Sequence, residues 1–252
     1  MPLTTPFKTC LVTLAFVTSG AYADNIRVAV ASNFTAPAKE IADKFEQDTG
    51  NTVELSFGSS GKFYAQLSNG APFEVFLSAD QEKPEALIND DLALADSRFT
   101  YAEGQLALWS ANPDKVDSEG KILDQDDFNR LALANPKLAP YGLAALQTLE
   151  TLELVDKTET KWVTGNNISQ TFQYVDTSNA DIGFVALSQI TQGNNITHGS
   201  AWIVPAEFYL PIRQDAVLMK SAERNATAQA FLDYLKSDQA HQVIQSYGYK
   251  VQ

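Results

Sequence analysis

The sequence predicts an α/β fold with mostly parallel strands. Two observations lead to this prediction. Short apolar or β-branched runs alternate with helical patterns along the chain, as they do where helices cover a parallel sheet. About 229 of the 252 residues remain once an N-terminal leader is set aside, and this length suits either one large domain or two small ones.

The first part of the chain alternates strand and helix three times. Strands are expected at residues 26–31, 52–57 and 73–78. Ile41 and Phe45 lie four residues apart on the helix after the first strand, and Gly50 is placed to end that helix. An Asn-Gly pair closes the second helix, and Asp80 is expected to be the N-cap of the third.

The rest of the chain repeats this alternation. Strands are expected at residues 105–110, 130–135, 161–165 and 181–188, and extended segments at 201–205 and 208–219. Helices are expected at residues 141–152, 168–175, 225–237 and 239–248. No linker rich in Pro, Gly or Ser is present, so two domains would be joined by strands that cross near residues 101–105 and 205–211.

Residues 1–23 have the pattern of a secretory signal peptide. Lys8 precedes a short apolar run, and Ala21-Tyr22-Ala23 has the small-x-small form of a cleavage site. The run is shorter than the roughly 20 residues that span a membrane. We therefore expect export through a cleaved signal peptide, with residue 24 as the mature start. Cys10 is the only cysteine and lies in the leader, so the mature chain is expected to have no disulfide and no cysteine-bound metal.

The mature chain is strongly acidic. Without Lys8 it carries 17 Lys and Arg residues against 31 Asp and Glu residues, a formal net charge of −14. A chain of this charge is repelled by nucleic acid and by anionic membrane surfaces, so neither is expected as a partner.

Four polar corners stand where a strand or loop passes into a predicted helix. They are Ser32-Asn33, Ser59-Ser60, Pro140-Tyr141-Gly142 and Asn166-Asn167-Ile168. Each helix start offers backbone N–H groups without intrahelical partners and the positive end of the helix dipole, which together suit an anion. Taken singly, each corner is an ordinary helix cap. Together in one cleft, they would hold an oxoanion without any Lys or Arg contact.

The residues around these corners resemble a known family. "VAVASNFTAPAKEIADKF", "SFGSSGKF" and "NGAPFEVFLSAD" resemble the N-terminal half of the periplasmic molybdate-binding proteins of ABC importers, the ModA family. "LANPKLAPYGLAALQTLE", "DIGFVALSQI" and "AQAFLDYLKSDQAHQVIQSYGY" match that family in order and spacing. The resemblance implies a type II periplasmic-binding-protein fold, in which two α/β lobes, each a mixed and mostly parallel sheet flanked by helices, close over a tetrahedral dianion.

This resemblance also implies the division of the chain. One lobe would comprise residues 24–103 and 208–252, and the other residues 104–207. It further implies a monomeric receptor that is not an enzyme, has no cofactor, and delivers molybdate or tungstate to the membrane permease of an ABC importer.

The site residues follow from the same resemblance. Ser32, Asn33 and Ser60 would bind the oxoanion from the first lobe, and Tyr141 and the backbone N–H of Ile168 from the second. No residue would bind the metal atom directly. Some family members have a binding tyrosine at the position of Ala186. The phenol of Tyr141 is a candidate to replace it.

The chemistry of the corners is consistent with this ligand class. Molybdate, tungstate and sulfate have only acceptor atoms near neutral pH, whereas hydrogen phosphate carries a proton and needs an acceptor such as a carboxylate. None of the four corners contains a carboxylate. Sulfate, or another oxoanion, remains an alternative, because its donor requirement is the same.

Two other classes have less support in the sequence. His198 and His241 are the only histidines, neither has acidic neighbours at metal-site spacing, and no G-x-S-x-G elbow is present, so an enzyme is not indicated. A ferric iron receptor would need a cluster of Tyr, His or carboxylate ligands, and Tyr141 is the only such residue among the corners.

Overall fold

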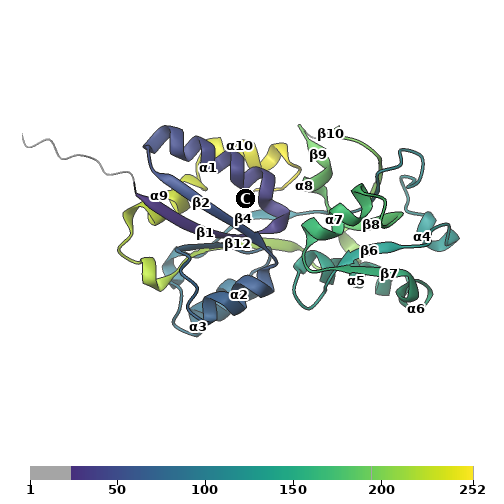
Figure 1. The fold of residues 1–252 in the computed structure, drawn as a ribbon, viewed down its shortest axis with the longest axis horizontal. Coiled ribbons are helices and arrows are strands. Elements are labelled where there is room, and N and C mark those ends of the chain that lie inside the picture. Colours follow the sequence, from purple (N-terminus) through teal and green to yellow (C-terminus); the bar gives the residue numbers. More distant parts are fainter. Residues whose placement is uncertain (1–23, 194, 252) are drawn as a thin grey trace, which may run out of the picture.

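The computed structural model describes residues 24–193 and 195–251, so the predicted signal peptide lies outside the described residues. These residues form two lobes, each built on a five-stranded sheet with helices on its faces (Figure 1). The two-lobed α/β fold predicted from the sequence is confirmed.

The first lobe contains both ends of the described chain. Its elements are β1 (Asn25–Ala31), α1 (Thr35–Thr49), β2 (Thr52–Gly58), α2 (Ser60–Ser68), β3 (Val75–Leu77), α3 (Glu82–Asn89), β4 (Phe99–Gly104), β12 (Ile212–Leu218), α9 (Ala226–Tyr234) and α10 (Asp238–Ser246). The strand order is β2-β1-β3-β12-β4. β2, β1 and β3 are parallel, and β12 is antiparallel to both of its neighbours.

The second lobe is formed by the middle of the chain. Its elements are β5 (Leu106–Ser110), α4 (Ile122–Gln125), β6 (Leu131–Ala134), α5 (Pro140–Thr151), α6 (Val155–Thr158), β7 (Trp162–Gly165), α7 (Ile168–Asp176), β8 (Ile182–Ala186), α8 (Leu187–Ile190), the short pair β9 (Thr191–Gln192) and β10 (Asn195–Ile196), and β11 (Ser200–Ile203). The order is β11-β5-β8-β6-β7, with β8, β6 and β7 parallel. Both sheets are thus mixed, with antiparallel pairs as numerous as parallel ones.

Alternating side chains of the strands form a core on each face of each sheet. In the first lobe, Ile26, Val28 and Val30 pack against α1, α9 and α10, whereas Ala29 and Phe76 pack against α2 and α3 on the other face (Figure 1). This alternation is the two-residue period of a strand that is buried on both sides.

The chain crosses between the two sheets twice. β4 ends at Gly104 in the first sheet and β5 begins at Leu106 in the second; the return runs from β11 to β12. The lobe boundaries at 103/104 and 207/208 stay a prediction. Within the extended segment predicted at 208–219, the structure has the strand β12. A 3₁₀ turn at Ala206–Phe208 precedes this strand.

The predicted cap of α3 is shifted by one residue. Gln81, not Asp80, occupies the N-cap position, and its side chain caps nothing. The Asp80 carboxylate nevertheless accepts the backbone N–H of Lys83 at 2.9 Å, so it satisfies a donor of the first turn from outside the helix.

Among the described residues, no helix is long and apolar enough to cross a membrane.

β12 carries an irregularity that separates two buried polar residues. Its register against β4 shifts between Gln214 and Asp215. The Asp215 carboxylate is 1 % exposed and accepts hydrogen bonds from Arg98 (2.6 Å) and Thr100 (2.7 Å), both on or beside β4. Gln214 is fully buried and bonds to a different set of residues near the cleft between the lobes.

Candidate anion-binding site

The polar corners of both lobes meet at one small cavity. All five residues predicted to bind the oxoanion line it, and none is more than 4 % exposed: Ser32, Asn33, Ser60, Tyr141 and Ile168. The cavity volume is about 10 Å³, whereas a surface groove on the first lobe has about 650 Å³. The site therefore suits one small, compact ligand rather than an organic solute.

Helix starts point at this cavity from both lobes. Ser60, Tyr141 and Ile168 each lie in the first turn of α2, α5 or α7, where backbone N–H groups have no intrahelical acceptor. Within the described part of the chain, these three N–H groups donate to no other protein atom. The cavity is thus lined by free donors at the positive ends of three helices.

Capping is performed by the residues that precede two of these helix starts. The Ser59 hydroxyl accepts the N–H of Lys62 at 3.4 Å, and the Asn167 side chain accepts the N–H of Gln170 at 2.9 Å. Ser60 and Ile168 are therefore not the caps of α2 and α7. The interpretation of these two corners as ordinary caps accounts for Ser59 and Asn167 but leaves Ser60 and Ile168 unexplained.

The hydroxyls of Ser32 and Ser60 differ in their hydrogen bonds to the protein. Ser60 Oγ accepts the backbone N–H of Ala79 at 2.9 Å, so its single hydrogen remains available to the cavity. Ser32 Oγ donates to no atom among the described residues, and Ser32 lines the cavity. The hydrogen of its hydroxyl is therefore also available to a ligand there.

The side chain of Asn33 is already occupied. Its two amide hydrogens point at Gln214 Oε1 (2.7 Å) and Tyr249 Oη (2.9 Å). A carboxamide has only these two donors, so the donor that Asn33 can offer the cavity is its backbone N–H. The sequence analysis missed Gln214 and Tyr249, which lie 181 and 216 residues from Asn33 and have no local motif that marks them.

The phenol of Tyr141 points toward the crossing between the lobes. Its hydroxyl accepts the Nε2–H of Gln214 at 3.3 Å, and a Cβ atom on Gly104 would lie 2.0 Å from it. Burial, with a contribution from the neighbouring Tyr249, raises the pKa of this phenol well above its ordinary value, so it stays neutral. This placement favours the backbone N–H of Tyr141 as its donor to the cavity, in place of the phenol that was expected to replace the tyrosine missing at Ala186.

The cavity itself is uncharged. Of the described residues that line it, none is a Lys, Arg, His, Asp or Glu. No group of three or more His, Cys, Asp or Glu side chains in the described ranges is arranged to hold a metal ion. Uncharged donors surround the cavity, so its chemistry is hydrogen-bond donation to an acceptor-rich ligand.

Direct contacts between the lobes close the cavity on two sides. Gly61 N–H donates to the carbonyl of Leu138 (2.9 Å), and Ser169 Oγ donates to the carbonyl of Ser32 (3.1 Å). Ser188 Oγ donates to the carbonyl of Asn33 at 2.9 Å. Two of these bonds end on the residues Ser32 and Asn33, so the position of the second lobe is tied directly to the binding corner of the first.

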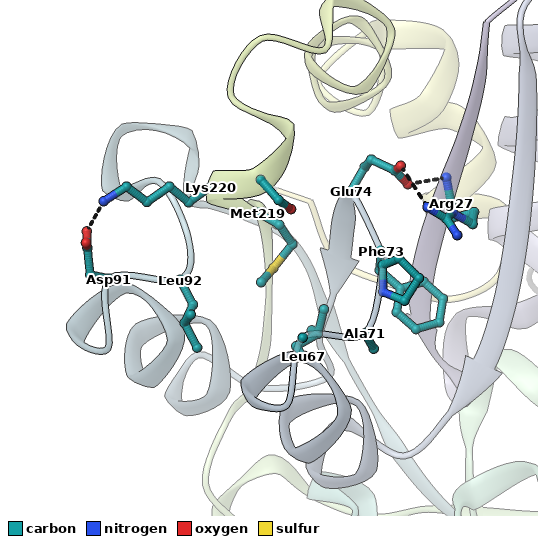
Figure 2. Close-up of a pocket in the computed structure, with 12 residues that line it drawn as sticks. Arg27, Leu67, Ala71, Phe73, Glu74, Asp91, Leu92, Met219 and Lys220 are labelled. Carbon is teal, nitrogen blue, oxygen red and sulfur yellow. Dashed lines mark hydrogen bonds and ion pairs between the residues drawn. The ribbon is translucent and has the colours of Figure 1, made fainter.

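A much larger groove lies elsewhere, on the first lobe (Figure 2). Its apolar floor includes Leu67, Leu92 and Met219. The charged side chains at its rim are paired with each other, Arg27 with Glu74 and Lys220 with Asp91. Because these charges already have partners, this groove offers no donor set comparable to that of the cavity between the lobes.

Comparisons with known proteins agree with this geometry. Residues 26–250 match the family model described as bacterial extracellular solute-binding protein. The chain is 53 % identical over 232 residues to the molybdate-binding protein ModA of Azotobacter vinelandii, covering 92 % of each chain, and 48 % identical to ModA of Rhodobacter capsulatus, covering 91 % of this chain and 89 % of that one. The solved periplasmic molybdate-binding protein of A. vinelandii superimposes with a TM-score of 0.88 at 43 % identity, covering 90 % of this chain and 99 % of that chain.

Proposed function

The chain belongs to the bacterial extracellular solute-binding proteins, and from this membership we propose that it captures molybdate or tungstate in the cavity between its lobes. It is the periplasmic receptor that delivers this oxoanion to the membrane permease of an ABC importer. The observation that carries the proposal is the convergence of unpaired N–H groups from the starts of α2, α5 and α7 on a cavity without charged side chains. The names of its relatives and their identity of about one half support the same ligand.

The proposed ligands of the oxoanion are all neutral donors. They are the hydroxyls of Ser32 and Ser60 and the backbone N–H groups of Asn33, Ser60, Tyr141 and Ile168. A hydrogen bond to a charged acceptor contributes about 1.5–3 kcal/mol, and a dianion with four acceptor oxygens can use several at once. Hydrogen phosphate would place its own proton against donors, which disfavours it. Because the donors are neutral, the site itself adds no negative charge that would repel the dianion. An acidic protein can therefore bind a dianion there.

Thermal unfolding of the ligand-free protein tests this function. The mature protein is denatured, dialysed, refolded, and heated with molybdate, tungstate, sulfate or phosphate. A ligand at 100 times its dissociation constant adds about 2.7 kcal/mol, which raises the Tm of a chain of this size by roughly 5–10 °C. We expect this rise with molybdate and tungstate alone. An equal rise with sulfate would make the protein a general oxoanion receptor, since the same donor set suits sulfate, and no rise with any of the four would refute the proposed function.

A second groove next to the cavity gives a prediction about binding rates. This groove is lined by Ser32, which it shares with the cavity, and by polar residues of α7, and Lys62 is its only charged residue among those described. The groove on the other side of the cavity contains Asp80 and Glu82 as well as Arg213. An anion approaching a protein of net charge −14 should therefore arrive through the groove of Lys62.

Lys62→Gln should slow molybdate association about two- to fivefold at low ionic strength and leave the dissociation rate unchanged. The difference should vanish in about 1 M salt, where the Debye length is only about 3 Å. Stopped-flow fluorescence measures both rates. Lys44→Gln, which removes the same charge from the Glu40 pair on α1, is the control. Equal slowing in both variants, or faster dissociation in Lys62→Gln alone, would contradict a steering role.

A further inference from the structure

Six neutral polar side chains form a buried cluster between the cavity and the crossing of the chain. We call it the hinge network; none of its members is more than 6 % exposed, and they are Asn33, Tyr101, Tyr141, Ser188, Gln214 and Tyr249. Two of them, Asn33 and Tyr141, also line the cavity. The other four residues do not line the cavity. Direct contact with a ligand therefore does not explain their hydrogen bonds.

Gln214 lies at the centre of the hinge network. Its Oε1 accepts hydrogen bonds from Asn33 Nδ2 (2.7 Å) and from Tyr101 Oη (3.0 Å), both in the first lobe. Its Nε2 donates to Tyr141 Oη (3.3 Å), in the second lobe. One fully buried amide on the return strand β12 therefore joins the binding corners of the two lobes.

Tyr249, near the end of the described chain, makes a second bridge. Its hydroxyl accepts from Asn33 Nδ2 (2.9 Å) and lies 2.9 Å from both the Asn33 carbonyl and Ser188 Oγ of the second lobe. Burial raises the pKa of Tyr249 to about 12, so this bridge carries no charge near the bound dianion. Both hydrogens of the Asn33 side-chain amide are thus used within the first lobe, by Gln214 and Tyr249, and the Asn33 carbonyl accepts Ser188 Oγ from the second lobe.

We propose that Gln214 is a positioning residue that makes closure of the lobes depend on the bound oxoanion. This inference rests on the proposed function and deepens it. Gln214 orients Asn33 and Tyr141, which line the cavity from opposite lobes. In the closed arrangement its amide is paired at both ends, whereas separation of the lobes removes Tyr141 and leaves a buried donor unpaired, which is unfavourable.

The peptide group between Ser32 and Asn33 links the ligand to closure. Its N–H belongs to Asn33 and is one of the proposed donors to the anion, while its carbonyl belongs to Ser32 and accepts Ser169 Oγ from the second lobe. An anion on the N–H polarises the peptide group and strengthens the hydrogen bond on its carbonyl. Ligand binding in the first lobe thereby strengthens a contact with the second.

The space for this network depends on a single glycine. A Cβ atom on Gly104 would lie 2.0 Å from Tyr141 Oη and 2.7 Å from Gln214 Nε2. Gly104 is the last residue of β4, where the chain leaves the first sheet. Because Gly104 has no side chain, Tyr141 can approach Gln214. A substitution of Gly104 would therefore disturb the contact between Tyr141 and Gln214 without changing either residue.

The test compares full mature proteins in which the length of residue 214 is kept but its hydrogen bonds are removed. Gln214→Met should raise the molybdate dissociation rate at least tenfold, with the association rate within twofold of wild type. Small-angle X-ray scattering should show a smaller molybdate-induced compaction. Gln81→Ala is the matched control, because Gln81 bonds to Asp215 and Thr100 within the first lobe. It should leave both readouts unchanged.

Gly104→Ala provides a second variant if Gln214→Met fails to fold. It should give the same combination of faster dissociation and reduced compaction. Unchanged dissociation and compaction in the folded variant would overturn the inference. Slower association with unchanged compaction would also overturn the inference, because Gln214 would then contribute only to packing. Failure of the wild-type protein to bind molybdate would instead refute the proposed function.

Discussion

Ser60→Ala is expected to weaken molybdate binding by at least tenfold. The Ser60 hydroxyl accepts the N–H of Ala79 at 2.9 Å, which fixes its oxygen and leaves its hydrogen for the ligand. Loss of one hydrogen bond to a charged acceptor costs about 1.5–3 kcal/mol, a factor of about ten to one hundred in the dissociation constant. Isothermal titration calorimetry of ligand-free protein measures the change directly. The fold should remain intact, because the change adds no volume, although the N–H of Ala79 loses its acceptor and the free energy of unfolding falls by about 1–3 kcal/mol.

The neighbouring serine is the control for this variant. Ser59 also lines the cavity, but its hydroxyl caps α2 through the N–H of Lys62. Ser59→Ala should lower the free energy of unfolding by about 1 kcal/mol and change the affinity much less than Ser60→Ala does. If Ser60→Ala binds as tightly as wild type, Ser60 is not a ligand. If the two variants are equally weak binders, the loss reflects a disturbed α2 rather than a missing donor.

Asp215→Ala is expected to lower the free energy of unfolding by about 3 kcal/mol, the low end of the range for removal of one partner of a buried ion pair. The carboxylate is nearly inaccessible, and its loss leaves the hydroxyl of Thr100 without its acceptor and the guanidinium of Arg98 with only the exposed Glu85 as a partner. The low end applies because the Arg98 side chain is 24 % exposed and retains some water. Urea unfolding of the ligand-free protein, followed by circular dichroism, gives the value.

An exposed ion pair of the same lobe provides the comparison. Asp91 pairs with Lys220, but the two side chains are 83 % and 46 % exposed. Asp91→Asn, which suits the positive φ of +59° at this position, should change the free energy of unfolding by less than about 1 kcal/mol, as is usual for surface pairs. Similar losses in Asp215→Ala and Asp91→Asn would show that burial of Asp215 adds nothing to the strength of its interactions.

The order and type of the elements could be predicted because their signals are local. Ile41 and Phe45 mark the buried face of α1, and Gly50 ends that helix with a φ of +75°, as a C-cap glycine does. The positions of Ser32 and Ser60 at strand-to-helix corners are equally visible in the sequence. Their meeting in one cavity was inferred from the resemblance to a family, because the corners of the two lobes are brought together by folding over long distances.

The features that escaped prediction depend on distant contacts. Nothing near Gln214 or Tyr249 indicates that both bond to Asn33, since no motif records a pairing across 181 or 216 residues. The direction of the Tyr141 phenol depends on the lack of a side chain at Gly104, a steric fact of the closed arrangement. Local patterns thus determine which residues stand at the corners, and tertiary packing determines which of their atoms remain free.

The place of β12 in the first sheet has a consequence for the biogenesis of the protein. β12 lies between β3 and β4, although more than one hundred residues separate it from either of them in the chain. During synthesis from the N-terminus, β3 and β4 are therefore made long before β12, the strand that pairs with both of them. Tyr249 joins the hinge network later still. A chain that lacks its C-terminal part therefore cannot complete the first sheet or the hinge network.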